Sequence, residues 1–504
     1  MPSHPIYSIR DIREIERQCL PGAQPPLMER AGNAAAHDAA QLLATRPGPV
    51  LVVCGPGNNG GDGFVLAREL RRQKHEITVV FAGDTARLPE DAAQAYAGFL
   101  QMGGKTLANI PPAPTGRWAL IVDALFGIGL QRPIENPLRD WINALNALPA
   151  LRLAIDIPSG LDADTGRILG TCLRATHTTT FIALKPGLLT LDGPDYCGKI
   201  SLQKIGIDAP SHIPPSGHLI SPSLFAAHLT PRPRNTHKGQ NGDACILGGA
   251  PGMAGAALLA ARAALHLGAG RVYACLLDSA APCVDPAQPE LMLRPAHQMP
   301  ERPSAIAIGP GLGTQEEAKH LLQTVIGLAI PLLFDADALN LISQEPNLIG
   351  PIASRHAATL LTPHPAEAGR LLGISTAEVQ ADRIAAALRL AQKFNAYTVL
   401  KGCGSVIAAP DGRWFINTTG NPGMASAGMG DVLSGITLAL LAQGWPAENA
   451  LLCAVHLHGE AADRLAAKNI GPIGLTAGET IFAARETFNA WAAENRASPG
   501  ITPT

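Results

Sequence analysis

Two glycine-rich segments lie far apart in the chain, and each carries an aspartate. The first is GPGNNGGDG at 55–63, which contains Asp62, and the second is GNPGMASAGMGD at 420–431, which ends in Asp431. Glycine lets backbone N–H groups close around a phosphate, and the start of a following helix adds a favourable dipole. A carboxylate beside such a loop repels phosphate, so it is better suited to accept a proton or hold a cation. The pattern predicts two enzymes fused in one chain, both acting on phosphate-bearing ligands.

Polar residues follow three predicted strands in the first half: Asn58 and Asn59 after VLVVC, Asp123 after WALIV, and Asp156 and Ser159 after LRLAI. In open parallel sheets, ligands bind outside the carboxyl ends of the strands. A single aspartate there is more often a cap or turn residue, but three such strand ends beside a glycine loop favour a site. We therefore expect Asn59, Asp123, Asp156 and Ser159 to meet at one edge. An all-oxygen set suits a hard cation such as potassium, magnesium or calcium.

The second half repeats this arrangement and adds a lysine. Its predicted strands end in 309–313, 335–340, 362–364 and 401–402. A phosphate-handling site needs a cation or lysine, a glycine loop and a base, and all three are present. A lone lysine is usually on the surface. Because Lys401 stands at a predicted strand end before GCGS, we favour a functional role for it.

Composition limits the classes of protein that fit. The chain has 504 residues, of which 46% are hydrophobic and 16% charged, and its formal net charge is −2. Without a basic stripe, nucleic acid is not an expected partner. The nine cysteines include no CxxC pair, which fits a reducing cytoplasm. With no signal-peptide pattern and no membrane-spanning apolar run, we expect a soluble cytoplasmic enzyme.

The order of predicted elements indicates an α/β fold with two doubly wound domains. In the first half we expect strands at 50–54, 76–81, 118–122, 151–155 and 178–184, and helices at 9–19, 27–43 and 61–72. In the second half we expect strands at 244–247, 271–275, 305–308, 332–334, 358–361 and 398–400, and helices at 254–267, 315–326, 377–393, 430–441 and 447–468. Six prolines between Asp208 and Lys238 predict a linker with one short helix near Leu224. The expected boundaries are 1–215, linker 216–236, and 237–495.

Two other interpretations of these motifs are less favoured. A hydride-transfer Rossmann domain would end its second strand in an acidic residue for the ribose, whereas Asp84 comes late and NNGGD does not fit the usual phosphate turn. On the helix 447–468, His456 and His458 point to different faces, which argues against a metal site. The cysteines, including Cys54, are most simply small core residues.

Several strings in the two halves resemble known families. GPGNNGGDGFVLAREL, VDALFGIGL, AIDIPSGLDADTG and LKPGLL resemble the YjeF N-terminal family of NAD(P)H-hydrate epimerases. HKGQNGDACILGGAPGMAGAALLAARAALHLGAG, AIGPGLG, DADALN, LTPHPAE, LKGCGSVI and TTGNPGMASAGMGDVLSGI resemble the NAD(P)H-hydrate dehydratases, whose domain is ribokinase-like. The order of the strings is that of the bifunctional bacterial repair enzymes, with the Rossmann-like half first.

The resemblance implies a metabolite-repair function. Reduced nicotinamide cofactors add water across a ring double bond, and the resulting hydrates, NADHX and NADPHX, are useless to dehydrogenases. The first half would interconvert the R and S hydrates at carbon six. The second half would dehydrate the S hydrate with an adenine nucleotide, ADP in most bacterial members and ATP in eukaryotic ones, with magnesium accompanying the nucleotide. A homo-oligomer is also expected.

The resemblance also implies site residues. Hydrate in the first half would be bound by Asn58, Asn59, Gly60, Gly61, Asp62, Gly127, Ile128, Gly129, Leu130, Gln131, Arg132, Pro133 and Asp156. Asp156 is also expected to be catalytic, and potassium would be held by Asn59, Asp123 and Ser159. Hydrate in the second half would contact Ala257, Gly311, His364 and Asp431. The nucleotide would contact Lys401, Gly402, Cys403, Gly404, Ser405 and Gly430. Asp431 is expected to take the hydroxyl proton while backbone amides receive the phosphoryl charge.

Two rival functions stay open at this point. A kinase of vitamin precursors or sugars would share the ribokinase-like fold and the GxGD end of the second glycine segment. Alternatively, the first half could be a non-catalytic nucleotide-binding module. The presence of Asn59, Asp123 and Asp156 argues against that second alternative.

Overall fold

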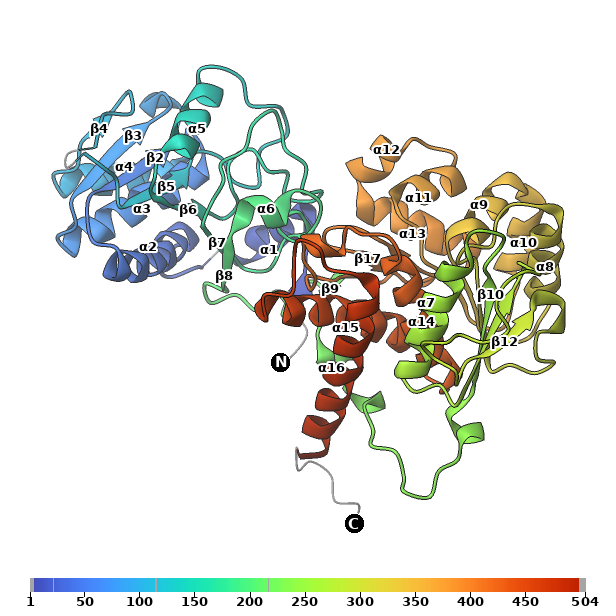
Figure 1. Cartoon of the computed structure of the whole chain (residues 1–504). Coiled ribbons are helices and arrows are strands. Elements are labelled where there is room, and N and C mark those ends of the chain that lie inside the picture. Colours follow the sequence, from blue (N-terminus) through green and yellow to red (C-terminus); the bar gives the residue numbers. More distant parts are fainter. Residues whose placement is uncertain (1–3, 21, 114–115, 216, 498–504) are drawn as a thin grey trace, which may run out of the picture. The chain divides into compact units, whose positions relative to one another are not determined.

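The structure is a computed structural model that describes residues 4–20, 22–113, 116–215 and 217–497. The chain divides into two compact units, Pro5–Gly217 and a second unit from His218 onward that also includes His4 (Figure 1). Residues 1–3, at the start of the first predicted domain, and Ser216, at the start of the predicted linker, lie outside the described residues. Over the described ranges, no helix is both long and apolar enough to cross a bilayer.

The first unit is built on a parallel sheet with the strand order β4-β3-β2-β5-β6-β7-β8. Its strands are β2 (Val50–Cys54), β3 (Ile77–Phe81), β4 (Thr106–Leu107), β5 (Leu120–Ala124), β6 (Leu151–Ile155), β7 (His177–Phe181) and β8 (Lys199–Gln203); the short β1 is Pro5–Ile6. Its helices are α1 (Ile9–Cys19), α2 (Leu27–Thr45), α3 (Asn58–Arg72), α4 (Glu90–Gln101), α5 (Leu138–Ala147) and α6 (Gly193–Cys197).

The continuous apolar run of β2 follows from burial on both faces of the sheet. Val50, Val52 and Cys54 pack into the core on one face, and Leu51 and Val53 pack into the core on the other. Side chains alternate between faces along a strand, so a strand covered by helices on both sides is apolar throughout. This arrangement leaves the carboxyl ends of the strands as the open edge of the unit.

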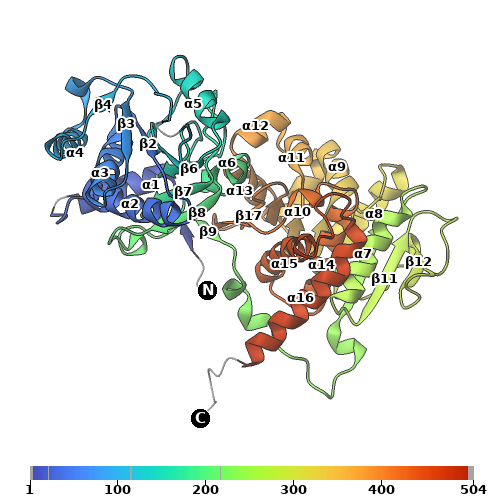
Figure 2. The ribbon, with the colours of Figure 1, turned by 60° about the vertical axis from the view of Figure 1, so that its left-hand side comes forward.

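The second unit has a larger mixed sheet that includes the order β18-β17-β16-β15-β14-β13-β10-β11-β12, parallel from β12 to β16 and antiparallel beyond. Its strands are β9 (Gly217–Leu219), β10 (Asp243–Gly248), β11 (Arg271–Leu276), β12 (Met292–Pro295), β13 (Ala305–Ile308), β14 (Leu332–Phe334), β15 (Thr359–Leu361), β16 (Tyr397–Leu400), β17 (Val406–Ala408) and β18 (Trp414–Ile416). Its helices are α7 (Ala254–His266), α8 (Glu316–Ile326), α9 (Ala336–Gln344), α10 (Ile349–Ala353), α11 (Pro365–Leu372), α12 (Thr376–Ala381), α13 (Arg383–Phe394), α14 (Met429–Ala442), α15 (Ala447–Ala467) and α16 (Ala477–Ala497) (Figure 2).

Helix α14 lies in the middle of the second core and approaches α7 closely. From Val432 to Ala442 its residues are buried on every side. A Cβ added at Gly435 would lie 2.1 Å from the carbonyl oxygen of Ala260, so only glycine allows the two helices to lie this close. The tight packing fixes the start of α14, and therefore Asp431, relative to the sheet.

The structure confirms the predicted α/β fold and corrects several element boundaries. Helix α3 begins at Asn58, so NNGG forms its first turn and not a free loop. Strand β5 begins later than expected and contains Asp123. The predicted helix 377–393 is two helices, because the Asp382 side chain accepts a hydrogen bond from Ala385 N and starts α13 anew. The predicted linker is not free either, since Phe225 and Leu229 are buried in the second core.

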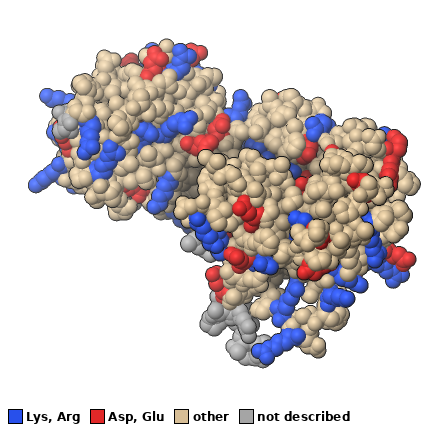
Figure 3. Space-filling model, viewed as in Figure 1, with Lys and Arg blue, Asp and Glu red and all other residues tan. Residues whose placement is uncertain are grey.

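Both signs of charge are scattered over the face of the molecule shown in Figure 3. Lysine and arginine alternate with aspartate and glutamate there, and neither sign forms a continuous stripe.

Candidate functional site

The first unit contains a cavity of about 810 Å³ at the carboxyl ends of its strands. The predicted hydrate-binding residues line this cavity, apart from Gly60, Gly61 and Pro133. The two glycines serve packing inside α3: a Cβ at Gly60 would lie 2.0 Å from the carbonyl oxygen of Gly55, and one at Gly61 would lie 2.5 Å from Met28 Sδ. Helix α1, which carries no predicted site residue, adds Arg13 and Glu16 to the lining.

Asp156 and Lys185 form a buried ion pair in the wall of this cavity. Lys185 Nζ lies 2.5 Å from Asp156 Oδ1 and also donates to Thr180 Oγ1 at 2.8 Å and to the carbonyl oxygen of Phe181 at 2.9 Å. The lysine side chain is 1% exposed and the aspartate side chain 12%. Asp156 comes directly after β6 and has φ of 66°, a left-handed conformation that is costly for a residue other than glycine. The ion pair and the strained backbone together fix this carboxylate at the cavity.

Three further carboxyl groups line the same cavity: Asp62 from α3, Glu16 from α1, and the exposed Asp91 from α4. Burial, with the charges of Asp156 and Glu16, raises the pKa of Asp62 well above its usual range. Burial and the charge of Asp156 raise the pKa of Glu16, although Lys185 and Arg13 act in the opposite direction. The cavity therefore holds one carboxylate bonded to a cation beside two carboxyl groups that favour the protonated form.

Asp123 and Ser159 meet beneath the cavity, as the strand-end argument predicted. Ser159 Oγ donates to Asp123 Oδ1 at 2.6 Å, and Ser159 N donates to Asp123 Oδ2 at 2.8 Å. Both side chains are fully buried, and burial raises the pKa of Asp123 to about 6 against the opposing effect of these hydrogen bonds. The other two residues of the expected set, Asn59 and Asp156, line the cavity itself, where Asp156 is paired with Lys185.

Asn59 is the third predicted cation ligand, and its amide lacks partners. Both Asn59 Oδ1 and Nδ2 are buried without a hydrogen bond among the described residues. A Cβ at Gly127 would lie 3.3 Å from Asn59 Oδ1, so the amide lies directly under the loop 127–133. Unpaired buried polar atoms are costly, and they are a common sign of a ligand or ion that completes the site.

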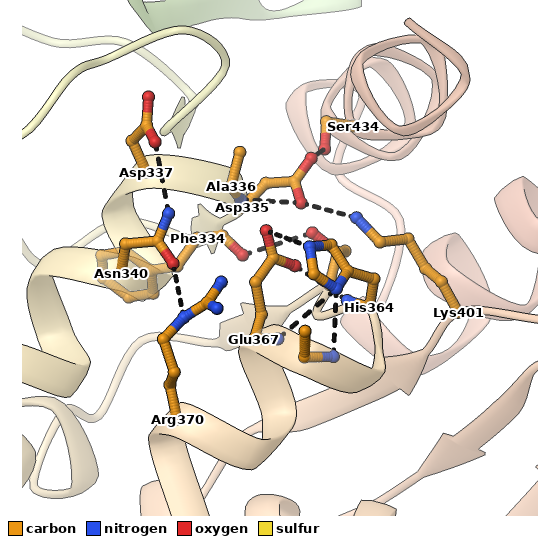
Figure 4. A network of polar contacts seen from close by, with 12 residues as sticks. Phe334, Asp335, Ala336, Asp337, Asn340, His364, Glu367, Arg370, Lys401 and Ser434 are labelled. Carbon is orange, nitrogen blue, oxygen red and sulfur yellow. Dashed lines mark hydrogen bonds and ion pairs between the residues drawn. The ribbon is translucent and has the colours of Figure 1, made fainter. Parts of the chain in front are cut away.

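The second unit centres on Asp335, which follows β14 and is 1% exposed (Figure 4). Its Oδ1 accepts from Lys401 Nζ at 2.9 Å, and its Oδ2 accepts from Ser434 Oγ at 2.7 Å. Burial lowers the pKa of Lys401, but the charges of Asp335, Glu367 and Asp431 outweigh burial and raise it. Lys401 is therefore held as an ammonium ion between β16 and the start of α14.

Asp431 stands in the first turn of α14, beside this lysine. Gly428, with φ of 87°, caps the helix, and a Cβ at Gly430 would lie 3.3 Å from Lys401 Nζ. Burial, followed by the charges of Asp335 and Asp337, raises the pKa of Asp431 to about 6, although Lys401 lowers it. The site thus combines an ammonium, a helix N-terminus and a carboxylate suited to accept a proton near neutral pH.

Further polar contacts fix His364 and the glycine loop that contains Gly311, two of the predicted hydrate contacts. His364 caps α11 through Nδ1, which accepts from Ala366 N at 3.1 Å, and its Nε2 lies 3.3 Å from Glu367 Oε1. Asp337 Oδ2 accepts from Gly313 N at 2.9 Å, which fixes the glycine loop that contains Gly311. A Cβ at Gly311 would lie 2.5 Å from the carbonyl oxygen of Met253, so this position admits only glycine.

The predicted nucleotide segment forms a tight turn after β16. Ser405 Oγ donates to the carbonyl oxygen of Gly402 at 3.0 Å, and Gly404 has φ of 61°. Cys403 is exposed. Ala257 is the exception among the predicted contacts: it is fully buried on α7, and a Cβ at Gly249 would lie 3.3 Å from its methyl group.

Comparison with known proteins matches both halves of the chain to protein families. Residues 24–187 match the model described as YjeF-related protein N-terminus, and residues 244–481 match the NAD(P)H-hydrate dehydratase model. The bifunctional NAD(P)H-hydrate repair enzyme Nnr of Coxiella burnetii is 39% identical over 94% of this chain and 97% of its own. The Escherichia coli enzyme of the same name is 41% identical over 92% of this chain and 90% of its own. The chain belongs to the bifunctional NAD(P)H-hydrate repair enzyme family.

A solved structure is also similar to the second half of this family member. The ADP/ATP-dependent NAD(P)H-hydrate dehydratase from Bacillus subtilis, co-crystallised with ATP and Mg²⁺, shares 31% identity with a TM-score of 0.49. It covers 54% of this chain and 97% of its own.

Four residues of the two sites were given no role of their own by the sequence reasoning. They are Glu16, Lys185, Asp335 and Ser434. Asp335 lies in the strand end 335–340, which the strand-end argument did include in the second site. Lys185 directly follows the predicted strand 178–184, a signal that the same argument could have used. Glu16 and Ser434 lie in helices, and their sequence surroundings give no sign of the pocket or partner they face.

Proposed function

We propose that this chain repairs hydrated NADH and NADPH. The first unit interconverts the R and S hydrates, and the second unit dehydrates the S hydrate with an adenine nucleotide, with ADP expected. The observation that carries the proposal is that relatives with this activity in their names match the chain across both halves. In support, each unit holds a carboxylate paired with a lysine at its strand ends.

In the first unit, Asp156 acts as the base of the epimerisation. Carbon six of the hydrate carries a hydroxyl group and the ring nitrogen, so it opens as any hemiaminal does. Asp156 takes the hydroxyl proton, a C=O bond forms, and the bond from carbon six to the ring nitrogen breaks. The nitrogen keeps the electron pair and accepts a proton from a protonated carboxyl group, for which Asp62 is available in the same cavity. Rotation and closure on the other face reverse each step and give the other epimer.

Potassium fits the residues beneath the cavity, and we propose Asn59, Asp123 and Ser159 as its ligands. The fit is supported by the unpartnered amide of Asn59 and by the buried carboxylate of Asp123. A bound cation would neutralise Asp123 and hold the loop above it. Ser159 also accepts from Phe126 N at 2.8 Å, which ties this loop to the same place. The loop 127–133 and Asn58 then close over the hydrate.

In the second unit, Asp431 acts as the base of a phosphoryl transfer. Hydroxide is a poor leaving group, so the hydroxyl of the S hydrate must first be phosphorylated. Asp431 takes the hydroxyl proton, the oxygen bonds to the terminal phosphorus, and the bond to the leaving nucleotide breaks. The lone pair of the ring nitrogen then expels phosphate, and loss of the neighbouring proton restores the reduced nicotinamide. The amides at the start of α14 and the ammonium of Lys401 stabilise the transferred charge.

The remaining residues of the second unit bind and orient the two substrates. Ala257, Gly311 and His364 are proposed on the hydrate side, and Gly430 with the turn 401–405 on the nucleotide side. The nucleotide phosphates would bring magnesium, a hard cation that suits the carboxylates at this edge. We further propose a cytoplasmic homo-oligomer.

We propose the domain boundaries 1–215 and 237–495, with 216–236 between them. A fragment beginning near Ser221 keeps the buried Phe225 and Leu229 of the second core, so it should fold alone. It should dehydrate the S hydrate and leave the R hydrate to slow spontaneous epimerisation. Rapid loss of both epimers with this fragment would show that the first unit is not needed for epimerisation.

The direct test of the function is recovery of reduced cofactor. A mixture of NADPH hydrate epimers is incubated with the protein and ADP or ATP, and near-ultraviolet absorbance is followed. The proposal predicts full recovery of NADPH. A stable phosphorylated product without recovery would instead identify a small-molecule kinase.

A further inference from the structure

Four carboxyl groups line the epimerase cavity; Asp91 is exposed, and of the other three described residues only Asp156 is bonded to a cation. Asp156 comes from the end of β6, Asp62 from α3, which follows β2, and Glu16 from α1. Strands β2 and β6 lie on either side of β5, so their ends are about 10 Å apart. A hydrated nicotinamide ring can therefore lie between Asp62 and Asp156. Which carboxylate accepts the proton then depends on which one is ionised.

Lys185 is the group that distinguishes Asp156 from the other two. Its three ammonium hydrogens have three acceptors, Asp156 Oδ1, Thr180 Oγ1 and the Phe181 carbonyl, so the lysine is held firmly and is not itself free to bind substrate. Thr180 Oγ1 and Phe181 N also approach Asp156 Oδ1, at 3.4 Å and 3.5 Å. Within the described residues, the side-chain hydrogen bonds of Asp156 all involve Oδ1. The second oxygen is left to accept a proton.

We propose that Lys185 is the positioning residue of the epimerase, which fixes Asp156 by its ion pair and selects it over Asp62 and Glu16 as the base. The inference rests on the proposed epimerase function and adds to it a residue that acts through Asp156. An ammonium ion in hydrogen-bond contact favours the charged form of a carboxylate, whereas carboxyl groups crowded around that charge favour the neutral form. The raised pKa values of Asp62 and Glu16 agree with this division.

The electrostatic surroundings of the pair contain few competing charges. Glu16 and Arg13 approach from α1, Asp62 from α3, and Asp91 lines the cavity from α4. Of the cationic side chains that line the cavity, Arg13 and Arg132 are exposed, and Lys185 is the one buried against Asp156. Removing the Lys185 charge would leave Asp156, Asp62 and Glu16 competing for the proton.

The test compares Lys185→Met and Lys185→Arg with the unaltered full chain. The rate of R-to-S epimerisation is measured from pH 5 to pH 9, with the epimers separated by chromatography. A neighbouring opposite charge moves the titration of a carboxyl group by about 1–3 pH units. Without that charge, the acid limb of the pH–rate profile of Lys185→Met should therefore move to higher pH by that amount. Its rate should fall at least tenfold near neutral pH and recover at higher pH. Lys185→Arg keeps the charge, so its pH–rate profile should have the same acid limb as that of the unaltered chain.

The controls separate a positioning role from a structural one. Lys204→Met removes an exposed lysine whose carboxylate contact, to Asp208, is 3.8 Å long, and it should leave the profile unchanged. If Lys185→Met fails to fold, Lys185→Gln keeps a hydrogen-bond donor without the charge and should show the same shift. A lower rate with an unmoved acid limb, or a normal rate, would overturn the role of Lys185. Absence of epimerisation by the unaltered chain would instead overturn the proposed function.

Discussion

Each unit holds a lysine bonded to an aspartate at the end of a parallel strand, but the surroundings of the two pairs differ. In the first unit both partners line the cavity, but the Asp156 side chain is 12% exposed while Lys185 is 1% exposed and has its three ammonium hydrogens bonded. In the second, Asp335 is closed off by Ser434 and Lys401, and Asp431 stands beside the lysine with a raised pKa. The first pair thus presents its carboxylate, and the second presents its ammonium. The same pair can serve proton transfer or phosphoryl transfer, depending on which partner faces the ligand.

The largest expected effect concerns the carboxylate outside the second pair. Asp431→Asn keeps the size of the side chain but cannot accept the hydroxyl proton, and removal of a general base lowers a rate by about 10²–10⁴-fold. Dehydration should fall by that factor while epimerisation is unchanged, as measured by turnover of each epimer. ADP affinity should be equal or higher because a negative charge has been removed. Near-normal dehydration by this variant would end the assignment of Asp431 as the base.

A smaller effect is expected at the cation site of the first unit. Asp123→Ala removes a buried carboxylate that Ser159 holds, and the loop 127–133 loses its support. Groups that support a metal site typically contribute about 10–100-fold to activity, so epimerisation should fall by that amount. Dehydration should be intact, and potassium should no longer affect the epimerase rate. Equal loss of both activities would indicate misfolding of the whole chain.

The activities of the two units should also respond differently as pH falls. The pKa of Asp431 is raised to about 6, and the base must be ionised to act, so activity is present above that value and lost below it. Below pH 6, dehydration should decrease about tenfold per pH unit, since the ionised fraction does. Epimerisation does not use Asp431, so its rate should not follow this acid limb. Coincident acid limbs for the two activities would contradict the difference between the pairs.

That experiment needs a control for unfolding. Burial lowers the pKa of both His456 and His458 to about 4, so these side chains favour folding while they are neutral. Their contribution is complete above their ordinary pKa of 6.5 and is lost as pH falls toward 4. Circular dichroism of the protein at each pH would show whether the second unit is still folded.

The sequence predicts elements with local signals well, but it does not predict contacts between distant residues. Strand Leu151–Ile155 and helix Ile9–Cys19 were predicted with the bounds that the structure has, because their apolar patterns and flanking residues are local signals. The break before α13 was missed although Asp382 is a readable cap. The contact of Lys185 with Asp156 and of Lys401 with Asp335 could not be read, because each joins residues on different elements. Strand ends predict which residues gather, but not which of them become partners.

We propose that two separate sites act in sequence on the two epimers. The most direct measurement uses the full-length Asp156→Asn variant, an epimer mixture of NADPH hydrate, and ADP, with near-ultraviolet absorbance followed to completion. We predict a fast phase at the normal rate whose amplitude equals the S fraction, followed by slow spontaneous conversion of the R hydrate. The unaltered chain should recover the full amplitude in one fast phase. Full recovery by Asp156→Asn at the normal rate would contradict the claim.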